Sequence, residues 1–332
     1  MVRGGIARSA SKAASVAFAG LLALAALAPA HAQQAYPNRP VRIVLPFAAG
    51  GVADITARLV AEKLSEKLVQ RFLIENQPGA GGIAAARAVL SSPADGYTLA
   101  MLTNGTAVSV PLFKSLPFDP LKDFTPISSL GLFDLVVVAN EQSQFKTLAE
   151  FLAAARAEPG KLNVGTINIG STQNLTAELL KSTAGVDFTI IPFRSTPDAI
   201  LALLRNDVQI VIDIYAALRS GLQDKKLRAI AVTGTARSEV LPNVPTAIEG
   251  GLRGFEVTSW NALYAPAGTP PEIVAALNAA LRAVLAAPEL KQRFSEFGIE
   301  AKASSGEELN ARMKADIDKW AAVIERAKIP KQ

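Results

Sequence analysis

The 332-residue sequence contains no cysteine and a single histidine, His31. Beyond residue 31, these absences exclude Ser–His and Cys–His nucleophile systems, thiolate chemistry, and zinc sites built on imidazole or sulfur. Without cysteine there are also no disulfides and no cysteine for a lipid anchor. Aspartate, glutamate, lysine and tyrosine remain, so catalysis is disfavoured without being excluded. No cofactor and no metal are expected.

The first 32 residues contain no acidic side chain. Arg3, Arg8 and Lys12 precede an almost wholly apolar stretch, 13–30, and Ala30-His31-Ala32 forms a small-x-small site. This pattern predicts a signal peptide, residues 1–32, that is cleaved after Ala32. The apolar stretch approaches the length of a membrane anchor, which is the alternative reading. We expect an exported protein without a lipid anchor.

The charge of the chain is nearly balanced once this leader is set aside. The whole sequence has 34 basic and 29 acidic residues, a net charge of +5, and the leader holds three of the basic residues. The remaining net charge is therefore +2, and no basic run is paired with stacking aromatics. These features exclude nucleic-acid binding. No segment after the leader is long and apolar enough to span a bilayer.

Short apolar runs alternate with helical patterns after residue 40, which indicates an α/β fold. The 300 residues beyond the leader are many for one core and suggest two domains. The predicted strands are Ile43–Leu45, Phe72–Glu75, Thr98–Leu102, Leu135–Ala139, Leu162–Thr166, Phe188–Pro192, Val208–Asp213 and Leu227–Thr233.

Several helix starts are marked by capping residues. Thr147 with Glu150, and Thr269 with Glu272, fit the capping box, the second with a proline at the first helical position. A C-terminal helix is expected to begin near Ser304 or Ser305. Its apolar stripe, which should dock on a core, consists of Leu309, Met313, Ile317, Trp320 and Ile324.

The segment 42–51 is the most informative part of the sequence. Ile43–Leu45 is predicted to be a buried strand, Gly50-Gly51 permits a tight turn, and a helix starts at Val52. Such a turn aims free backbone N–H groups at one point, which favours an anion. The turn lacks the lysine of a Walker loop and the spacing of the dinucleotide fingerprint. A small carboxylate is therefore favoured over a nucleotide, and Asp54 is a favourable acid in the first helical turn.

Two further turns combine the same features with hydroxyl and amide side chains. Thr103-Asn104-Gly105-Thr106 closes one predicted strand, and the turn that ends in Gly170, Ser171, Thr172 and Gln173 leads into another helix, predicted at about 174–181. The hydroxyls of Ser171 and Thr172 can either cap this helix or hold a ligand oxygen.

A third turn contains a cation close to a buried acid. Thr196 is predicted as an N-cap, with Pro197 at the first helical position. Arg194, just before it, suits bidentate binding of a carboxylate, or it pairs with Asp198. Asp213 ends an apolar strand and needs a partner, which can be a ligand, Arg194 or a backbone N–H.

Ordered motifs along the chain resemble the Bug-type extracytoplasmic receptors of tripartite tricarboxylate transporters. The matching segments are 36–41 (YPNRPV), 46–51 (PFAAGG) with Asp54, Ala57 and Arg58, 75–82 (ENQPGAGG), 94–99 (ADGYTL), 116–120 (LPFDP), 159–162 (PGKL), 241–246 (LPNVPT), 249–251 (EGG) and 265–270 (APAGTP). Together they cover essentially all of the chain after the leader.

This resemblance implies a type II periplasmic-binding-protein fold, an α/β fold with two lobes joined by two crossing strands. The first lobe would comprise 33–133 plus 258–332 and the second 134–257, with the second crossing near Trp260–Ala265. The implied protein is a periplasmic, monomeric receptor that binds an organic carboxylate in the cleft between the lobes and delivers it to transporter membrane subunits.

The family's binding positions correspond to Phe47, Ala48, Ala49 and Gly50 in the first lobe and to 170–173 in the second. Gly51, in the same turn, is a further candidate for ligand binding. Two departures are evident: many relatives have histidine where this chain has Asn174, and tyrosine-lysine/arginine-glycine at 193–195. The ligand therefore cannot be copied from a relative. A sensor that feeds a signalling partner, and an enzyme with Asp54 or Asp213 as base, are the alternative functions.

Overall fold

The computed structural model describes Met1 and residues 36–332. The predicted signal peptide lies outside the described residues, apart from Met1. Residues 39–332 form one compact unit, and the fold below is that of this unit. Of the preceding unit, 1–38, the structure describes only Met1 and residues 36–38.

Strands and helices alternate along most of the described chain. The strands are β1 (Val41–Leu45), β2 (Phe72–Asn76), β3 (Thr98–Thr103), β4 (Phe124–Asn140), β5 (Asn163–Ile167), β6 (Thr189–Phe193), β7 (Ile210–Ile214), β8 (Leu227–Val232), β9 (Thr258–Pro266) and β10 (Glu300–Ala301). The helices are α2 (Val52–Leu68), η1 (Ala80–Gly82), α3 (Ile83–Leu90), α4 (Asn104–Leu112), α5 (Leu148–Ala157), α6 (Thr172–Ala184), α7 (Thr196–Leu204), α8 (Tyr215–Gln223), α9 (Pro271–Ala286), α10 (Pro288–Ser295) and α11 (Gly306–Arg326).

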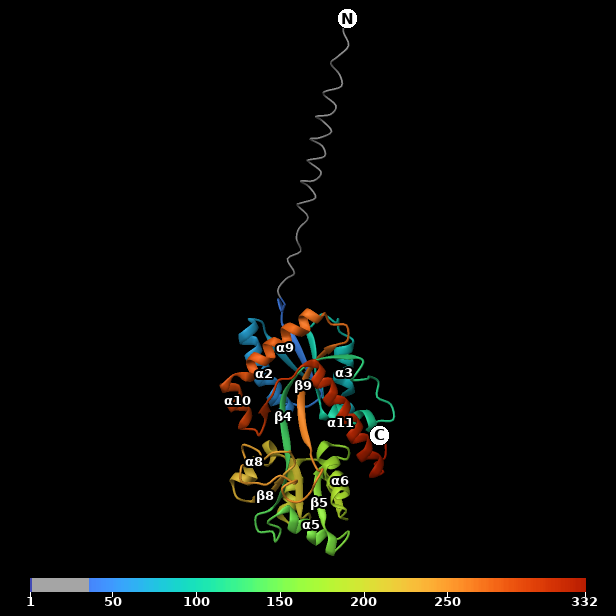
Figure 1. The fold of residues 1–332 in the computed structure, drawn as a ribbon, viewed down its shortest axis with the longest axis vertical. Coiled ribbons are helices and arrows are strands. Elements are labelled where there is room, and N and C mark those ends of the chain that lie inside the picture. The colour runs from blue at the N-terminus through green and yellow to red at the C-terminus, as the bar shows by residue number, and fades with distance from the viewer. Residues whose placement is uncertain (2–35) are drawn as a thin grey trace. The chain divides into compact units, whose positions relative to one another are not determined.

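The strands pair in the order β2-β1-β3-β9-β4-β7-β5-β6, with β8 and β10 also paired to β4. Strand β4 changes partner along its length: Phe124–Asp134 pairs with β9, and Leu135–Asn140 pairs with β7 and β8. Two sheets therefore share β4, and helices pack on each of them. The first lobe contains β1, β2, β3, β9, β10 and the first part of β4, and the second lobe contains β5, β6, β7, β8 and the second part of β4. Figure 1 shows β4 and β9 side by side between them.

All eight predicted strands are present, but the sequence analysis missed most of β4. Leu135–Ala139 was predicted, whereas the strand starts at Phe124. The missed part contains Pro126, two serines and Gly131, residue types that are rare in strands. Its register shifts at two places, between Pro126 and Ser128 and between Ser129 and Gly131. These bulges accommodate the proline and bend the strand.

Gly131 is required by a close approach of another segment. A Cβ at this position would lie 2.5 Å from Ile299 Cγ2, closer than real side chains come. The glycine therefore lets β10 pair with β4 at this point. Gly131 thus disfavours a strand in the sequence, yet this close packing of the segment 299–301 on β4 requires a glycine.

Strand β9 was also absent from the predicted strands and was placed only through the family resemblance, near Trp260–Ala265. It is antiparallel to both β3 and β4 and is buried from Ser259 to its end. Its sequence, TSWNALYAP, mixes serine, asparagine and proline with apolar residues. Because both faces are buried, it shows no alternation of apolar and polar residues that would reveal it.

The predicted capping box at Thr147 is confirmed, and so is the predicted start of the C-terminal helix, whose N-cap is Ser305. The box at Thr269 is wrong. Pro270 is the N-cap of α9, and the Thr269 hydroxyl donates to the carbonyl oxygen of Pro266 at 2.8 Å. In α11, four of the five predicted stripe residues are fully buried, and Ile317 is partly buried.

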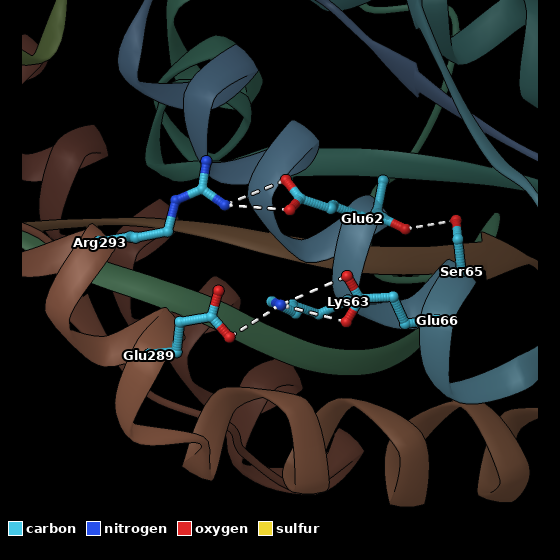
Figure 2. A network of polar contacts seen from close by, with 7 residues as sticks. Glu62, Lys63, Ser65, Glu66, Glu289 and Arg293 are labelled. Atoms are coloured by element: carbon cyan, nitrogen blue, oxygen red, sulfur yellow. Dashed lines mark hydrogen bonds and ion pairs between the residues drawn. The ribbon is translucent and has the colours of Figure 1, made fainter.

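Ion pairs join helix α10 to helix α2, as Figure 2 shows. Arg293 Nη1 lies 3.1 Å from a carboxylate oxygen of Glu62, and Lys63 Nζ lies 2.9 Å from Glu289 and 3.1 Å from Glu66. Exposed pairs of this kind contribute little stability individually. They show that a segment near the end of the chain packs on the first helix of the first lobe.

Among the described residues, no single helix has the length and apolar character needed to cross a membrane. Helices α9 and α10 have that length and apolar character only when they are taken together, and the two helices are bent by 71° relative to each other.

Asp134 lies in β4 at the point where the strand changes partner. Burial raises the pKa of its carboxyl from 3.8 to about 6; a hydrogen bond from Thr258 opposes this, and Glu256 and Glu300 add to it. The Thr258 hydroxyl donates to Asp134 Oδ1 at 2.8 Å. Since the folded state favours the protonated carboxyl, this group stabilises the fold fully below pH 3.8 and loses its contribution as the pH rises through 6.

Asp134→Asn should therefore stabilise the protein at pH 8 by up to about 3 kcal/mol. The amide keeps an acceptor for Thr258 and carries no charge to bury. Urea unfolding at pH 4 and pH 8 measures the effect, and the gain should vanish at the lower pH. A variant whose stability follows the pH exactly as the wild type does would show that this carboxyl is not the titrating group.

Candidate ligand-binding cleft

A cavity of about 450 Å³ lies between the two lobes, beside the strands that connect them. Its lining residues come from the β1–α2 and β3–α4 turns, from the connecting strands, and from the β5–α6 and β7–α8 turns. They are Phe47, Gly51, Val52, Ala53, Thr103, Gly105, Phe133, Leu135, Ile167, Asn168, Gly170, Ser171, Thr172, Gln173, Ile214, Ser259 and Asn261.

The N-terminus of α2 forms part of the first-lobe wall. Its N-cap, Gly51, makes no side-chain capping bond, and the first intrahelical bond runs from Ile55 N–H to Gly51 O. The N–H groups of Val52 and Ala53 therefore have no acceptor within the helix. Both residues line the cavity. This helix end presents an uncapped positive dipole to the cavity, which suits an anion.

Asp54 braces the turn before this helix instead of lining the cavity. Its carboxylate accepts from Gly50 N–H at 2.9 Å, from Arg58 Nε at 2.9 Å and from Asn76 Nδ2 at 2.9 Å. Burial raises its pKa, but the bonds from Arg58, Gly50 and Asn76 outweigh this, so the net pKa is lowered. Asp54 is thus ionised at neutral pH, and its charge is matched by Arg58.

The second-lobe wall is built by the turn before α6. Ser171 is the N-cap: its hydroxyl accepts from Asn174 N–H at 3.1 Å and donates to Ile167 O at 2.7 Å. Gly170 N–H donates to Asn174 Oδ1 at 3.1 Å, so Asn174 stabilises the turn. The capping role of Ser171 is confirmed, and the first-turn N–H groups of Thr172 and Gln173 remain for a ligand.

A hydrogen-bonded chain joins the two lobes across one side of the cavity. The Thr172 hydroxyl, at the start of α6, donates to Asn104 Oδ1 at 3.0 Å. Asn104 Nδ2 donates to Asp316 Oδ2 of α11 at 3.2 Å, and Trp260 Nε1 of β9 donates to the same oxygen at 2.6 Å. Asn104 thus connects the lobes and does not itself line the cavity.

Asp213 is fully buried and orients a residue of the cleft. It accepts from Gln173 Nε2 at 2.9 Å, from the Thr196 hydroxyl at 2.5 Å and from Ile214 N–H at 2.8 Å. Burial raises its pKa, and these three donors oppose the rise. Of the alternative partners that the sequence analysis left open for Asp213, a backbone N–H is present and Arg194 is not.

The predictions around Arg194 need two further corrections. The N-cap of α7 is Ser195 instead of Thr196. Thr196 is the first helical residue, and its hydroxyl donates to Asp213. Arg194 is exposed, and among the described residues it has no hydrogen bond or ion pair. The predicted pair with Asp198 is therefore absent; Asp198 accepts from the Ser195 hydroxyl at 2.7 Å.

The structure brings together about half of the predicted site residues. Those that line the cavity are Phe47, Gly51, Thr103, Gly170, Ser171, Thr172 and Gln173. Those that lie outside the lining are Ala48, Ala49, Gly50, Asp54, Asn104, Arg194 and Asp213. Sequence reasoning missed the floor of the cavity, Phe133, Leu135, Ser259 and Asn261, because these residues belong to the connecting strands and have no motif of their own.

No lining residue is charged. In addition, no group of three or more His, Cys, Asp or Glu side chains within the described part of the chain could hold a metal ion. The cavity therefore offers backbone N–H groups, hydroxyls and amides, together with apolar side chains. Such a site binds a small solute by dipoles and shape.

Two α/β lobes that share long connecting strands and enclose a neutral cleft define a solute-binding receptor. The chain belongs to the tripartite tricarboxylate transporter family receptors, whose family description matches residues 56–329. It is a Bug-type receptor of that family, with the two-lobed fold of periplasmic binding proteins.

Three solved structures illustrate the similarity. The periplasmic binding protein BugD is 31% identical, with a TM-score of 0.75, and the match covers 90% of this chain and 100% of that one. MatC from Rhodopseudomonas palustris with bound malate is 35% identical, TM-score 0.74, with 87% and 100% covered. An R. palustris protein with adipate is 33% identical, TM-score 0.78, with 89% and 99% covered.

Proposed function

We propose that this protein is a periplasmic receptor that captures a small organic carboxylate in its cleft and delivers it to a membrane transporter of the tripartite tricarboxylate type. The observation that carries the proposal is the uncapped N-terminus of α2 facing the first turn of α6 across a neutral cavity. Two sets of unpaired N–H groups, one from each lobe, can then share one carboxylate.

Three findings support parts of this proposal. The family description names a transporter receptor, and relatives of similar length have been solved with malate and with adipate. BugD is a periplasmic binding protein, which supports the same location here. The neutral lining, without an acid or base in the cavity, gives a bound solute no partner for catalysis. We expect a monomer that does not act as an enzyme.

We further propose that the lobes comprise 33–133 plus 258–332 and 134–257. The change of partner between Asp134 and Leu135 in β4, and the start of β9 at Thr258, support these bounds. Closure would follow from population shift: a ligand held by both lobes binds the closed state better and draws the equilibrium toward it.

The test is a thermal-shift screen of protein that has been unfolded and refolded to remove bound solute. A ligand at a hundred times its Kd adds about 2.7 kcal/mol, which raises the midpoint by a few degrees. A shift with carboxylates, and none with the matching amides and alcohols, is the expected result. Shifts produced only by neutral or cationic compounds would refute the carboxylate site.

The bond between Thr172 and Asn104 predicts a measurable contribution to closure. Thr172→Val keeps the shape of the side chain and its backbone N–H, but removes the hydroxyl that joins the lobes. A neutral hydrogen bond is worth about 0.5–1.5 kcal/mol, so the Kd for any bound carboxylate should rise about two- to tenfold. Calorimetric titration measures this change. An unchanged Kd would mean that the bond does not distinguish the closed state from the open one.

A further inference from the structure

A second cavity lies between the lobes, on the opposite face of the connecting strands from the cleft. Its volume is about 530 Å³, and we call it the hinge groove. Asp134 of β4 and Thr258 of β9 line the hinge groove, their neighbours Leu135 and Ser259 line the cleft, and Phe133 borders both. Successive side chains of a strand point to opposite faces. A bend of β4 and β9 that narrows one cavity therefore widens the other.

The two lobes meet across the hinge groove. Gly298, just before β10 in the first lobe, and Tyr215, at the start of α8 in the second lobe, both line it. They pack against each other, because a Cβ at position 298 would lie only 2.8 Å from the Tyr215 ring. A movement of the lobes therefore changes the width of the groove at this contact.

Asp134 is held at the point where β4 passes from one lobe to the other. Its Oδ1 accepts from the Thr258 hydroxyl at 2.8 Å. Gly234, which follows β8 in the second lobe, packs against the same carboxyl, since a Cβ at position 234 would collide with it. Within residues 36–332, no cation forms an ion pair with this carboxyl.

Charged side chains from both lobes line the hinge groove together with Asp134. Burial raises the pKa of Asp134 to about 6, and Glu256 and Glu300 add to the rise. Glu300 belongs to β10 of the first lobe, whereas Glu256 lies between β8 and β9. The charged groups are Arg237 and Glu239 after β8, Glu256, Glu300, Lys302 after β10, and Arg312 of α11.

The cations of the groove have carboxylate partners of their own. Arg237 Nε lies 3.0 Å from Glu249, and Lys302 Nζ lies 3.6 Å from Glu300. Arg312 acts on Asp316, where it is one of the groups that oppose the rise in pKa caused by burial. Deprotonation of Asp134 would therefore add an unpaired negative charge between two other carboxylates, one of them on the first lobe.

The effect of this charge on the lobes has a definite sign. Widening the hinge groove lets water reach the Asp134 carboxyl and moves it away from Glu300, and both changes lower its pKa. The carboxylate form therefore favours the wide groove and the closed cleft. The protonated form favours the narrow groove and the open cleft.

We propose that the Asp134 carboxyl is a pH-sensitive switch of the hinge, whose deprotonation widens the groove and closes the cleft. The receptor then holds its ligand at neutral pH and releases it in acid. The statement about the ligand rests on the proposed function, whereas the statement about the lobes does not. A ligand that binds the closed state better displaces the proton from Asp134, so its affinity rises as the pH passes upward through about 6.

The absence of cysteine from the chain allows a direct test of the lobes. Ala49→Cys and Ile169→Cys place two spin labels on exposed residues of the turns that form the two walls of the cleft. Double electron–electron resonance on refolded, ligand-free protein should show a shorter distance between the labels at pH 8 than at pH 5. With Asp134→Asn added, the distance should keep its pH 5 value at both pH values.

Two further variants test the charges around the switch. Glu300→Gln should move the midpoint of the distance change to lower pH, because Glu300 raises the pKa of Asp134. Glu307→Gln removes the same charge from an exposed residue of α11 outside the groove, and should leave the midpoint unchanged. A label distance that does not depend on pH, or that depends on pH equally with and without Asp134→Asn, would overturn the proposal.

Calorimetric titration with malate and with adipate at pH 5 and pH 8 tests the ligand. The ratio of the Kd at pH 5 to the Kd at pH 8 should be at least about threefold larger in the wild type than in Asp134→Asn, which corresponds to half a pKa unit between the two states. The variant also corrects for the titration of the acids themselves. Equal ratios would refute the release of ligand in acid. If the label distance responds as expected and neither acid binds, the hinge switch stands, and the extension of the proposal to these ligands fails.

Discussion

Gly51→Asp is expected to weaken carboxylate binding by at least about a hundredfold, which corresponds to about 2.7 kcal/mol. The substitution places a carboxylate at the N-cap of α2, where it takes the N–H groups that the ligand needs and repels the ligand's own charge. The fold should survive: Gly51 has φ −81° and ψ 170°, which any residue adopts, and a Cβ there meets nothing within 4 Å.

The matched control is Gly51→Asn. Asparagine caps the helix as well as aspartate does and has nearly the same shape, but it carries no charge. Calorimetric titration should show a loss of less than about tenfold for asparagine, and urea unfolding should show both variants at least as stable as the wild type. Equal losses for the two variants would show that capping of the N–H groups or steric obstruction, and not charge repulsion, causes the loss. Wild-type affinity in the aspartate variant would remove α2 from the binding site.

Gly170→Ala is expected to reduce both the stability and the affinity. Gly170 has φ +79°, and a Cβ there would collide with the side chain of Leu112. The strained backbone costs about 1–3 kcal/mol, and the collision adds to this. Because Leu112 belongs to α4 in the first lobe and Gly170 to the second, the collision also opposes the approach of the lobes, and the Kd should rise at least about tenfold.

Gly185→Ala separates the effect of backbone strain from the effect of the collision with Leu112. Gly185 also has a positive φ, +60°, but a Cβ there meets nothing within 4 Å, and the residue ends α6 at the far end from the cleft. This variant should lose stability through strain alone and keep its affinity. Urea unfolding and calorimetry of the two variants therefore measure the contact between the lobes. Equal Kd values would show that Gly170 and Leu112 do not meet in the bound state.

The sequence predicted the two walls of the cleft because strand–turn–helix units carry local signals. Glycine turns, N-cap hydroxyls and apolar runs at 42–51 and 165–173 are each determined within ten residues, and the structure has these turns where they were expected. The role of Ser171 as the N-cap of α6 followed from its neighbours in the same way.

The remaining errors concern contacts between residues that are distant in sequence. Arg194 was one of the possible partners of Asp213, but the Thr196 hydroxyl and Gln173 donate to the carboxylate, and neither donor was foreseen. The bond between Thr172 and Asn104 spans 68 positions and has no local signature. The prediction missed the first part of β4 because its serines, proline and Gly131 do not favour a strand by themselves. These residues are placed by the pairing of β4 with β9 and β10, which are distant in the sequence.

The position of β9 also determines when the first lobe can fold. Strand β9 lies between β3 and β4, so the first sheet lacks a central strand until the chain has been made as far as Pro266. The second sheet, from Leu135 to Val232, is continuous in sequence and can form earlier. Long-range pairing of this kind slows folding. An emerging chain would thus carry an incomplete first lobe for most of its synthesis, and a chain cut before Thr258 would expose the unpaired edges of β3 and β4 to aggregation.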